Sequence, residues 1–138
     1  MADKTTVRWE SEMSFDVELH GHHFSVDADE EFGGRDRGPK PKGLVLSALA
    51  GCTGMDVVSI LGKMRMPFDG FRVEVEGEIA DEHPRVFTKI HIRYILTGDQ
   101  LDEAKVERAV SLSCEKYCAV HAMLSKSSEV THEILLNP

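Results

Sequence analysis

Apolar and polar residues alternate in six segments of the chain, which predicts six β-strands. The first three are expected at 5–10, 14–20 and 22–28, with His20–Gly21 as a tight turn between the last two. Two more, at 71–79 and 86–96, flank a turn at His83–Pro84, and a final strand is expected at 129–136. The pattern therefore predicts an antiparallel meander, a second hairpin and a closing strand.

A long apolar segment from Pro41 to Met64 predicts a central helix. Nearly every position between Leu44 and Leu61 is apolar or small, and a helix that is apolar all round is a buried one. Pro41 suits the first turn of a helix, where its missing N–H is not needed. At about 100° per residue, one narrow sector of the helix collects polar residues and a thiol: Cys52, Asp56, Ser59 and Lys63. Burial of this polar seam costs free energy unless it is hydrogen-bonded or faces a cavity.

Two shorter helices are predicted between the second hairpin and the last strand. Asp99 can cap a helix that begins near Leu101, and a second helical piece covers residues 117–125. The apolar stripe of the first of these helices is Val106, Ala109, Val110 and Ser113. The predicted order is β-β-β-α-β-β-α-α-β, which is an α+β fold with antiparallel sheets around a buried central helix.

Length and charge narrow the classes of protein to consider. A chain of 138 residues predicts a single domain over residues 1–138. Its net charge of −8 argues against nucleic acid and anionic membranes as general partners. No signal peptide is visible at the start, and the central apolar run carries Asp56 and two glycines, so a core helix is favoured over a membrane span. We therefore expect a cytoplasmic protein.

The three cysteines are an odd number in a small chain, which points to a reducing compartment and to thiols that are used rather than crosslinked. Cys52 heads the polar seam and is either a nucleophile at a cavity or a small core residue. Cys114 and Cys118 are four residues apart, so on one regular helix their Cβ atoms would lie about 5–6 Å apart. A disulfide needs about 3.5–4.5 Å. If either one forms a bridge, Cys52 is therefore its natural partner.

The reactivity of Cys52 depends on the charges around it, because the thiolate is the nucleophile. Four basic residues precede the helix in the loop at 29–42: Arg35, Arg37, Lys40 and Lys42. If the loop folds back, this cluster lowers the pKa of Cys52, whereas an ionised Asp56 one turn away raises it. The sequence leaves the balance open.

Histidines offer weaker candidates. The cluster His20–His23 can bind a transition metal, but no Asp, Glu or Cys completes a set at metal spacing, so we expect no metal site and no cofactor. His121, three residues after Cys118, is either a base or a surface residue of an amphipathic helix.

The runs Gly38–Leu61 (GPKPKGLVLSALAGCTGMDVVSIL) and Arg108–Leu124 (RAVSLSCEKYCAVHAML) resemble the OsmC/Ohr family of osmotically inducible and organic hydroperoxide resistance proteins. The second run looks most like a divergent OsmC-like branch. The resemblance implies an OsmC-like α+β fold and an intertwined homodimer. In such a dimer the central helices pack between two sheets, and both subunits contribute to each active site.

The resemblance also implies a chemistry. Characterised members are thiol peroxidases, in which Cys52 matches the peroxidatic cysteine and Cys118 matches the resolving cysteine. Arg35, with Arg37 as the alternative, is the candidate for the arginine that activates the peroxidatic thiol. A hydroperoxide is the implied substrate, and a dithiol reductant of the lipoyl type reduces the resulting disulfide.

The chain departs from the family pattern at three places. Lys42 follows Pro41 where characterised peroxidases have Asn-Pro-Glu, Ala119 replaces the proline after Cys118, and Cys114 is an additional thiol. The departures keep other interpretations open, namely a small-molecule-binding dimer, a thiol–disulfide exchange protein, or three cysteines that only fill the core.

Overall fold

The predicted order of strands and helices is confirmed in the computed structural model, which describes residues 1–138. Two short elements are added, a 3-10 helix (Glu30–Phe32) and a π-helix, η2 (Ser113–Tyr117). The chain divides into two units, Met1–Val45 and Leu46–Pro138, which are described separately. The predicted α+β class is correct, and the single-domain organisation stays a prediction.

The first unit contains a three-stranded antiparallel sheet in the order β1-β2-β3. Its strands are β1 (Thr5–Ser11), β2 (Ser14–Leu19) and β3 (His22–Val26). The turn predicted at His20–Gly21 is confirmed, with φ angles of 51° and 78°. Positive φ at both central residues is typical of the hairpin turn whose twist matches that of the strands.

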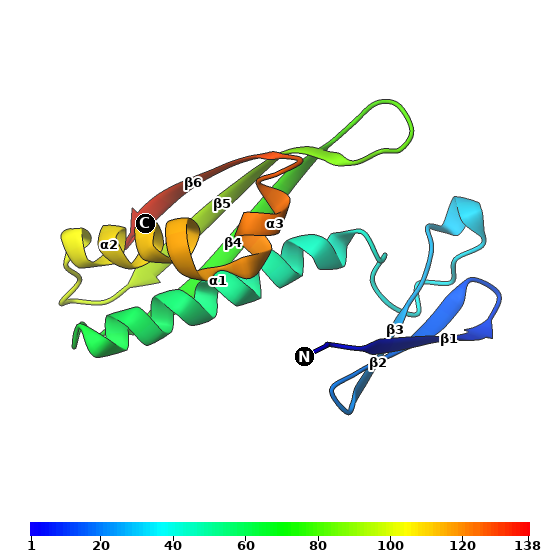
Figure 1. Ribbon diagram of the computed structural model, residues 1–138, viewed down its shortest axis with the longest axis horizontal. Coiled ribbons are helices and arrows are strands. Elements are labelled where there is room, and N and C mark those ends of the chain that lie inside the picture. Colours follow the sequence, from blue (N-terminus) through cyan, green and yellow to red (C-terminus); the bar gives the residue numbers. More distant parts are fainter. The chain divides into compact units, whose positions relative to one another are not determined.

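The second unit contains a three-stranded sheet in the order β4-β5-β6 (Figure 1). Its strands are β4 (Gly70–Ile79), β5 (Phe87–Thr97) and β6 (Glu129–Leu136). β4 and β5 pair antiparallel as predicted, but β6 runs parallel to β5, which the expectation of antiparallel sheets did not include. The chain returns through two helices before β6, and such a crossover is the connection that parallel neighbours require.

Three α-helices accompany the second sheet (Figure 1): α1 (Gly43–Lys63), α2 (Glu103–Leu112) and α3 (Ala119–Leu124). The cap of α2 is Asp102 and not Asp99, because the Asp102 side chain accepts a hydrogen bond from the Lys105 N–H at 3.3 Å. The predicted stripe of α2 is confirmed, since all its members are fully buried: Val106, Ala109, Val110 and Ser113.

The core of the second unit lies between α1, α2 and one face of the sheet. Along β5 the buried residues alternate with charged ones, and the buried set is Ile90, Ile92, Tyr94 and Leu96. α1 faces them with residues spaced four apart, which form one stripe of a helix: Leu49, Thr53, Val57 and Leu61. The prediction of a helix buried all round is wrong for the single chain, because Met55 is 75% exposed and Val58 46% exposed on other faces of α1.

By length and composition alone α1 is sufficient to cross a membrane, a test that the core helix of a globular protein also passes. Its packing is that of a core helix, since its buried stripe joins the same apolar cluster as β5 and α2.

Shortening Leu61, which is fully buried in this cluster, tests the packing of α1 on the sheet. We expect Leu61→Ala to lower the free energy of unfolding by about 2–5 kcal/mol, because it removes buried methyl groups and leaves a cavity. Met123→Ala, at a residue that is 61% exposed, serves as the control and should change it little. Urea denaturation followed by circular dichroism measures both. Equal effects of the two substitutions would contradict the described packing.

Candidate functional site

Cys52 and Cys118 lie side by side in the second unit. Cys52 is in the middle of α1 and is partly exposed, whereas Cys118 precedes α3 and is only 3% exposed. The Cys52 thiol is close enough to raise the pKa of Cys118, and both cysteines are free. The sequence predicted Cys52 as the natural partner of Cys114 or Cys118, and the structure brings it to Cys118.

The π-helix η2 sets the position of Cys118. The Cys118 N–H donates to the Ser113 carbonyl at 2.9 Å, a bond that spans five residues instead of four. Cys118 then adopts an extended conformation (φ −78°, ψ 105°) and caps α3, where its Sγ accepts from the His121 N–H at 3.4 Å. Cys114 and Cys118 therefore do not lie on one regular helix. The distance expected between their Cβ atoms had assumed such a helix. Such π-type insertions are frequent at functional sites.

The surroundings of Cys114 and Cys118 favour the protonated form of each thiol. Burial raises the pKa of Cys118, the His121 N–H opposes this and the Cys52 thiol adds to it, with a result of about 11. Burial also raises the pKa of Cys114; the Tyr94 hydroxyl opposes this shift, and the carboxylates of Glu115 and Asp56 add to it. Both residues are neutral thiols near pH 7.

A chain of hydrogen bonds runs through the core beside the thiols. The Thr53 hydroxyl is 2.7 Å from the Tyr94 hydroxyl and 2.7 Å from Ser113 Oγ. Ser113 donates to Asp56 Oδ2 at 2.8 Å, and the Tyr94 hydroxyl lies 3.5 Å from Cys114 Sγ. Thr53, Tyr94 and Ser113 are fully buried. This hydrogen-bond chain was not predicted from the sequence, although a threonine and a serine inside two apolar stripes were its signal.

The polar seam of α1 is partly exposed, and its Asp56 has both a hydrogen-bond partner and a cavity. Asp56 binds Ser113, and it lines a pocket of about 280 Å³ together with residues of α1, α2 and η2. The other residues that line this pocket are Ser59, Ile60, Lys63, Leu112 and Tyr117.

Arg35 and Arg37 belong to the first unit, where two carboxylates hold their loop. The buried Asp27 side chain accepts backbone N–H groups of Ala28, Arg35 and Arg37 at 2.8, 3.0 and 3.2 Å. Glu12 pairs with Arg35 Nε at 2.7 Å and with Arg37 Nη2 at 3.2 Å. Neither carboxylate was identified from the sequence, because only folding brings it to the loop. The approach of Arg35 to Cys52 stays a prediction.

Two histidines of the His20–His23 cluster pair with carboxylates. His20 Nε2 lies 2.6 Å from Asp3, and His23 Nδ1 lies 3.0 Å from Asp16. His121 is half-buried, and its ring Nδ1 lies 3.2 Å from the Ser125 hydroxyl. Burial, followed by the neighbouring His132, lowers the pKa of His121, so its ring is neutral near pH 7.

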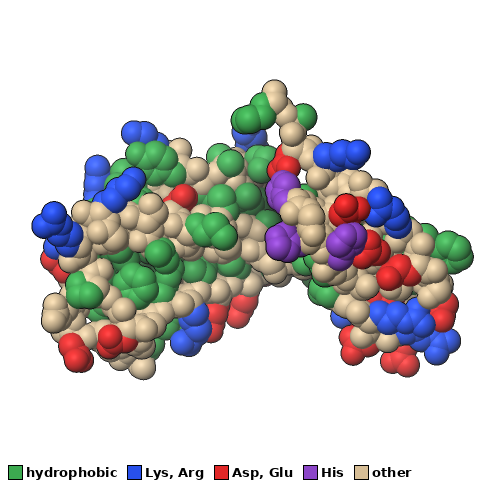
Figure 2. Space-filling model, turned by 90° about the horizontal axis from the view of Figure 1, so that it is seen from below, with side chains coloured by type: hydrophobic (Ala, Val, Ile, Leu, Met, Phe, Trp, Pro, Cys, Tyr) green, Lys and Arg blue, Asp and Glu red, His purple; other side chains and the backbone are tan.

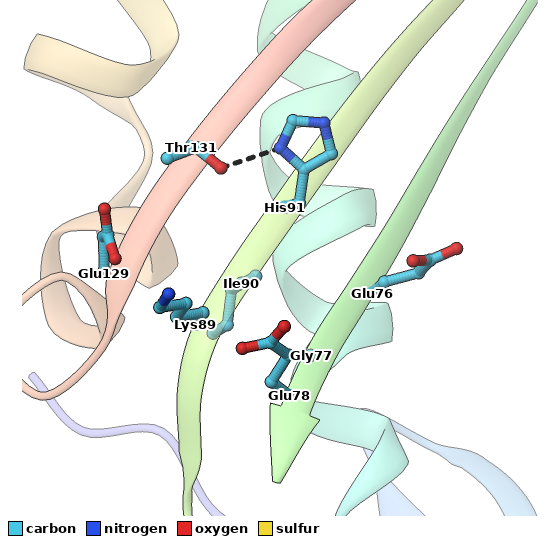
Figure 3. Close-up of a pocket in the computed structure, with 8 residues that line it drawn as sticks. All are labelled: Glu76, Gly77, Glu78, Lys89, Ile90, His91, Glu129 and Thr131. Carbon is cyan, nitrogen blue, oxygen red and sulfur yellow. Dashed lines mark hydrogen bonds between the residues drawn. The ribbon is translucent and has the colours of Figure 1, made fainter.

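A second, charged pocket of about 320 Å³ lies on the outer face of the sheet in the second unit (Figure 3). His91 lines this pocket, and its ring nitrogens lie 2.7 Å from Thr131 and 2.6 Å from Glu133. His91 alternates along β5 with the buried Ile90 and Ile92, so this pocket opens on the face opposite the core. It is therefore separate from the Thr53–Tyr94 hydrogen bond, which lies in that core.

Comparison with known proteins agrees with this architecture. The profile described as OsmC-like protein matches residues 33–133. Protein YhfA of Escherichia coli K12 is 41% identical over 127 residues, which are 91% of this chain and 92% of YhfA. The chain belongs to the OsmC-like family.

Solved structures of other OsmC-like and related proteins share the fold. A hypothetical protein from Aquifex aeolicus superposes with a TM-score of 0.84 at 27% identity, and the match covers 100% of this chain and 99% of the other. The organic hydroperoxide resistance protein OhrB of Bacillus subtilis superposes with a TM-score of 0.63 at 18% identity, covering 97% and 98% of the two chains. At that identity the second likeness shows the fold alone.

The raised pKa of Cys118 predicts slow alkylation that accelerates steadily with pH. Because its pKa is about 11, the thiolate fraction rises tenfold per unit between about pH 7 and pH 10. Iodoacetamide labelling of the reduced protein, quantified for each peptide by mass spectrometry, measures the rate. A rate that levels off by about pH 9.5, as it does for an ordinary cysteine with a pKa of about 8.5, would contradict the described burial.

The buried carboxylate of Asp27 predicts that the arginine loop is sensitive to acid. Hydrogen bonds from the backbone, the Arg35 N–H foremost, hold the pKa of Asp27 below its usual range. A carboxylate with a lowered pKa stabilises the fold above its unfolded pKa of about 4, and this stabilisation is lost as the pH falls further. Amide signals of Arg35 and Arg37 in an NMR titration should shift together in that range. In Asp27→Asn this shared transition should be absent, and its persistence would assign it to another group.

Proposed function

We propose that this chain is a thiol-dependent peroxidase that reduces organic hydroperoxides, with Cys52 as the peroxidatic and Cys118 as the resolving cysteine. The observation that carries the proposal is the contact between two free thiols from separate elements. One is partly exposed and the other is buried behind it. A substrate reaches the exposed thiol, and the buried one is in position to react only with its neighbour.

The reaction proceeds in two steps within this chain. The Cys52 thiolate attacks the outer oxygen of the hydroperoxide, the O–O bond breaks, and the alkoxide leaves as the alcohol after it takes up a proton. Cys52 becomes a sulfenic acid. Cys118 then attacks the Cys52 sulfur, the S–O bond breaks, and hydroxide leaves as water with the proton of the Cys118 thiol. The Cys52–Cys118 disulfide results.

The high pKa of Cys118 suits this second role. A protonated and buried thiol does not compete for the hydroperoxide, because the thiolate is the nucleophile. It also carries the proton that the departing hydroxide requires. The contact with Cys52 supplies the proximity that a weak nucleophile needs.

A dithiol reductant completes the cycle by thiol–disulfide exchange, in which its two thiols become a disulfide and both cysteines are regenerated. Arg35 is the proposed activator of the Cys52 thiolate, and the pairing of Arg35 with Glu12 supports the idea that its side chain is held in place. A dithiol pool and reduced thiols favour the cytoplasm as the site of action.

A homodimer is part of the proposal. Hydrophobic side chains gather on the surface of the second unit (Figure 2). There a groove of about 570 Å³ between α1 and β4 has an apolar lining that includes the exposed Met55 and Val58. A contiguous apolar surface marks an interaction site, and a second copy of the chain would cover it.

Relatives support the same chemistry. The similar structures from Legionella pneumophila and Bacillus subtilis are described as organic hydroperoxide resistance proteins, with TM-scores of 0.71 and 0.63. Their identities of 15% and 18% support the fold, while the thiol pair of this chain supports the activity.

A thiol map tests the proposal directly. The reduced protein is treated with one equivalent of cumene hydroperoxide, alkylated and digested, and the disulfide-linked peptides are identified by mass spectrometry. We expect a stoichiometric Cys52–Cys118 pair with release of cumyl alcohol. Cys52→Ser should abolish hydroperoxide consumption, and Cys118→Ser should stop the cycle at a sulfenic acid that dimedone traps on Cys52.

Cys114→Ser is the matched control, because Cys114 has no part in the two steps, and it should retain the Cys52–Cys118 disulfide. Full consumption of hydroperoxide by Cys52→Ser would overturn the proposal. If the parent protein keeps three free thiols, a non-peroxidase role in binding would replace it.

A further inference from the structure

Cys114, the thiol that the proposed cycle does not use, ends a hydrogen-bond chain whose other end is Asp56. The members follow one another as Cys114, Tyr94, Thr53, Ser113 and Asp56, at 3.5, 2.7, 2.7 and 2.8 Å. They come from η2, β5 and α1, so the hydrogen-bond chain links three elements. All of them lie within the second unit.

Counting protons fixes the direction of these hydrogen bonds. A hydroxyl has one proton to donate, and an ionised carboxylate only accepts. With Asp56 ionised, Ser113 gives its proton to the carboxylate, so Thr53 must donate to Ser113. Tyr94 must then donate to Thr53. The remaining contact is satisfied only if the Cys114 S–H donates to the Tyr94 oxygen.

The opposite direction requires the opposite charges at the two ends. A Cys114 thiolate accepts a hydrogen bond from Tyr94, so Tyr94 must accept one from Thr53, and Thr53 must accept one from Ser113. Ser113 then needs a hydrogen-bond donor at position 56. That donor exists only if Asp56 is protonated. Because Thr53, Tyr94 and Ser113 are fully buried, no water competes for these bonds, and an unpaired hydroxyl there costs free energy.

We propose that this hydrogen-bond chain is a proton relay that keeps Cys114 in the thiol form while Asp56 is ionised, and that, as long as the chain is unbroken, Cys114 becomes a nucleophile only when its proton is transferred to Asp56. Four protons each move by one bond: from Cys114 to Tyr94, from Tyr94 to Thr53, from Thr53 to Ser113 and from Ser113 to Asp56. A neutral thiol and a carboxylate become a thiolate and a carboxylic acid, and no net charge is created.

The relay assigns a role to Cys114, the additional thiol of this protein. In the cycle proposed above, Cys114 would compete with Cys118 for the Cys52 sulfenic acid if it ionised readily. The relay withholds Cys114, and the pocket at its far end, which Asp56 shares with Lys63 and Tyr117, gives the proton an exit to solvent. This consequence rests on the proposed function, whereas the relay itself does not.

Charged side chains lie near the ends of the hydrogen-bond chain and act on Cys114 directly. Glu115 and Asp56 both raise the pKa of Cys114, so a through-space effect of the Asp56 charge must be separated from the relay. Thr53→Val makes that separation, because it interrupts the hydrogen-bond chain in the middle with a side chain of similar shape and leaves the Asp56 side chain in place. Tyr94 is then free to donate to the Cys114 thiolate.

Iodoacetamide alkylation of the reduced protein near neutral pH tests the relay, with the rate at each cysteine followed by mass spectrometry. The rate at Cys114 is divided by the rate at Cys118 in the same sample, so that opening of the fold, which exposes both, cancels. We expect Thr53→Val to raise this ratio about tenfold, since a hydrogen bond to a charged group is freed for the thiolate. Asp56→Asn should raise it too, because an amide no longer imposes one direction.

The matched control is Thr53→Val combined with Tyr94→Phe, which removes the phenol that would donate to the thiolate and should return the ratio to the parent value. An unchanged ratio in Thr53→Val, with an increase only in Asp56→Asn, would overturn the relay in favour of through-space charge. An increase that survives Tyr94→Phe would overturn it as well. No hydroperoxide is used, so the outcome is independent of peroxidase activity.

Discussion

The hydrogen bonds of the Thr53 hydroxyl hold the second unit in one register. Thr53 on α1 is fully buried and binds both Tyr94 on β5 and Ser113 on η2. A slip of α1 by one residue would turn this hydroxyl about 100° away and leave three buried oxygens unpaired. The same register places the thiols. Cys52 is the residue before Thr53, and the Cys118 N–H donates to the carbonyl of Ser113, five residues before it.

Periodicity predicted most of the fold because most of it follows two simple rules. Strands alternate, and helices repeat their apolar residues every three or four positions, so β5 and the stripe of α2 could be read directly. The π-helix could not, because one inserted residue changes the hydrogen-bond partners without changing the apolar pattern. The cap of α2 was misplaced because Asp99 and Asp102 both precede the stripe. The exposed apolar side of α1 was missed because composition reports hydrophobicity and not what covers it.

The candidate site was predictable to a smaller extent. Spacing and composition left Cys52 open between a nucleophile and a core residue, and the family resemblance, rather than the residue pattern, paired it with Cys118. Partners that only folding brings together were not predictable: Glu12 is 23 residues from Arg35, and Asp27, although close in sequence, binds the loop through backbone N–H groups that no side-chain pattern reveals. Thr53 and Ser113 were visible only as polar residues in apolar stripes, and Tyr94 as one large residue on a buried strand face.

Three identical thiols acquire different chemistry here from their surroundings alone. Cys52 has partial exposure and a neighbouring thiol, Cys118 is buried at the start of a short helix, and Cys114 donates into a chain of hydroxyls. Burial acts on both Cys114 and Cys118 and cannot by itself distinguish them. The distinction comes from their partners. Cys118 contacts a thiol that becomes electrophilic once oxidised, whereas Cys114 contacts a phenol whose proton is already committed to Thr53. A site can therefore contain a third cysteine without using it, provided that this cysteine has to donate its proton to a hydrogen-bond chain that a charged Asp56 orients.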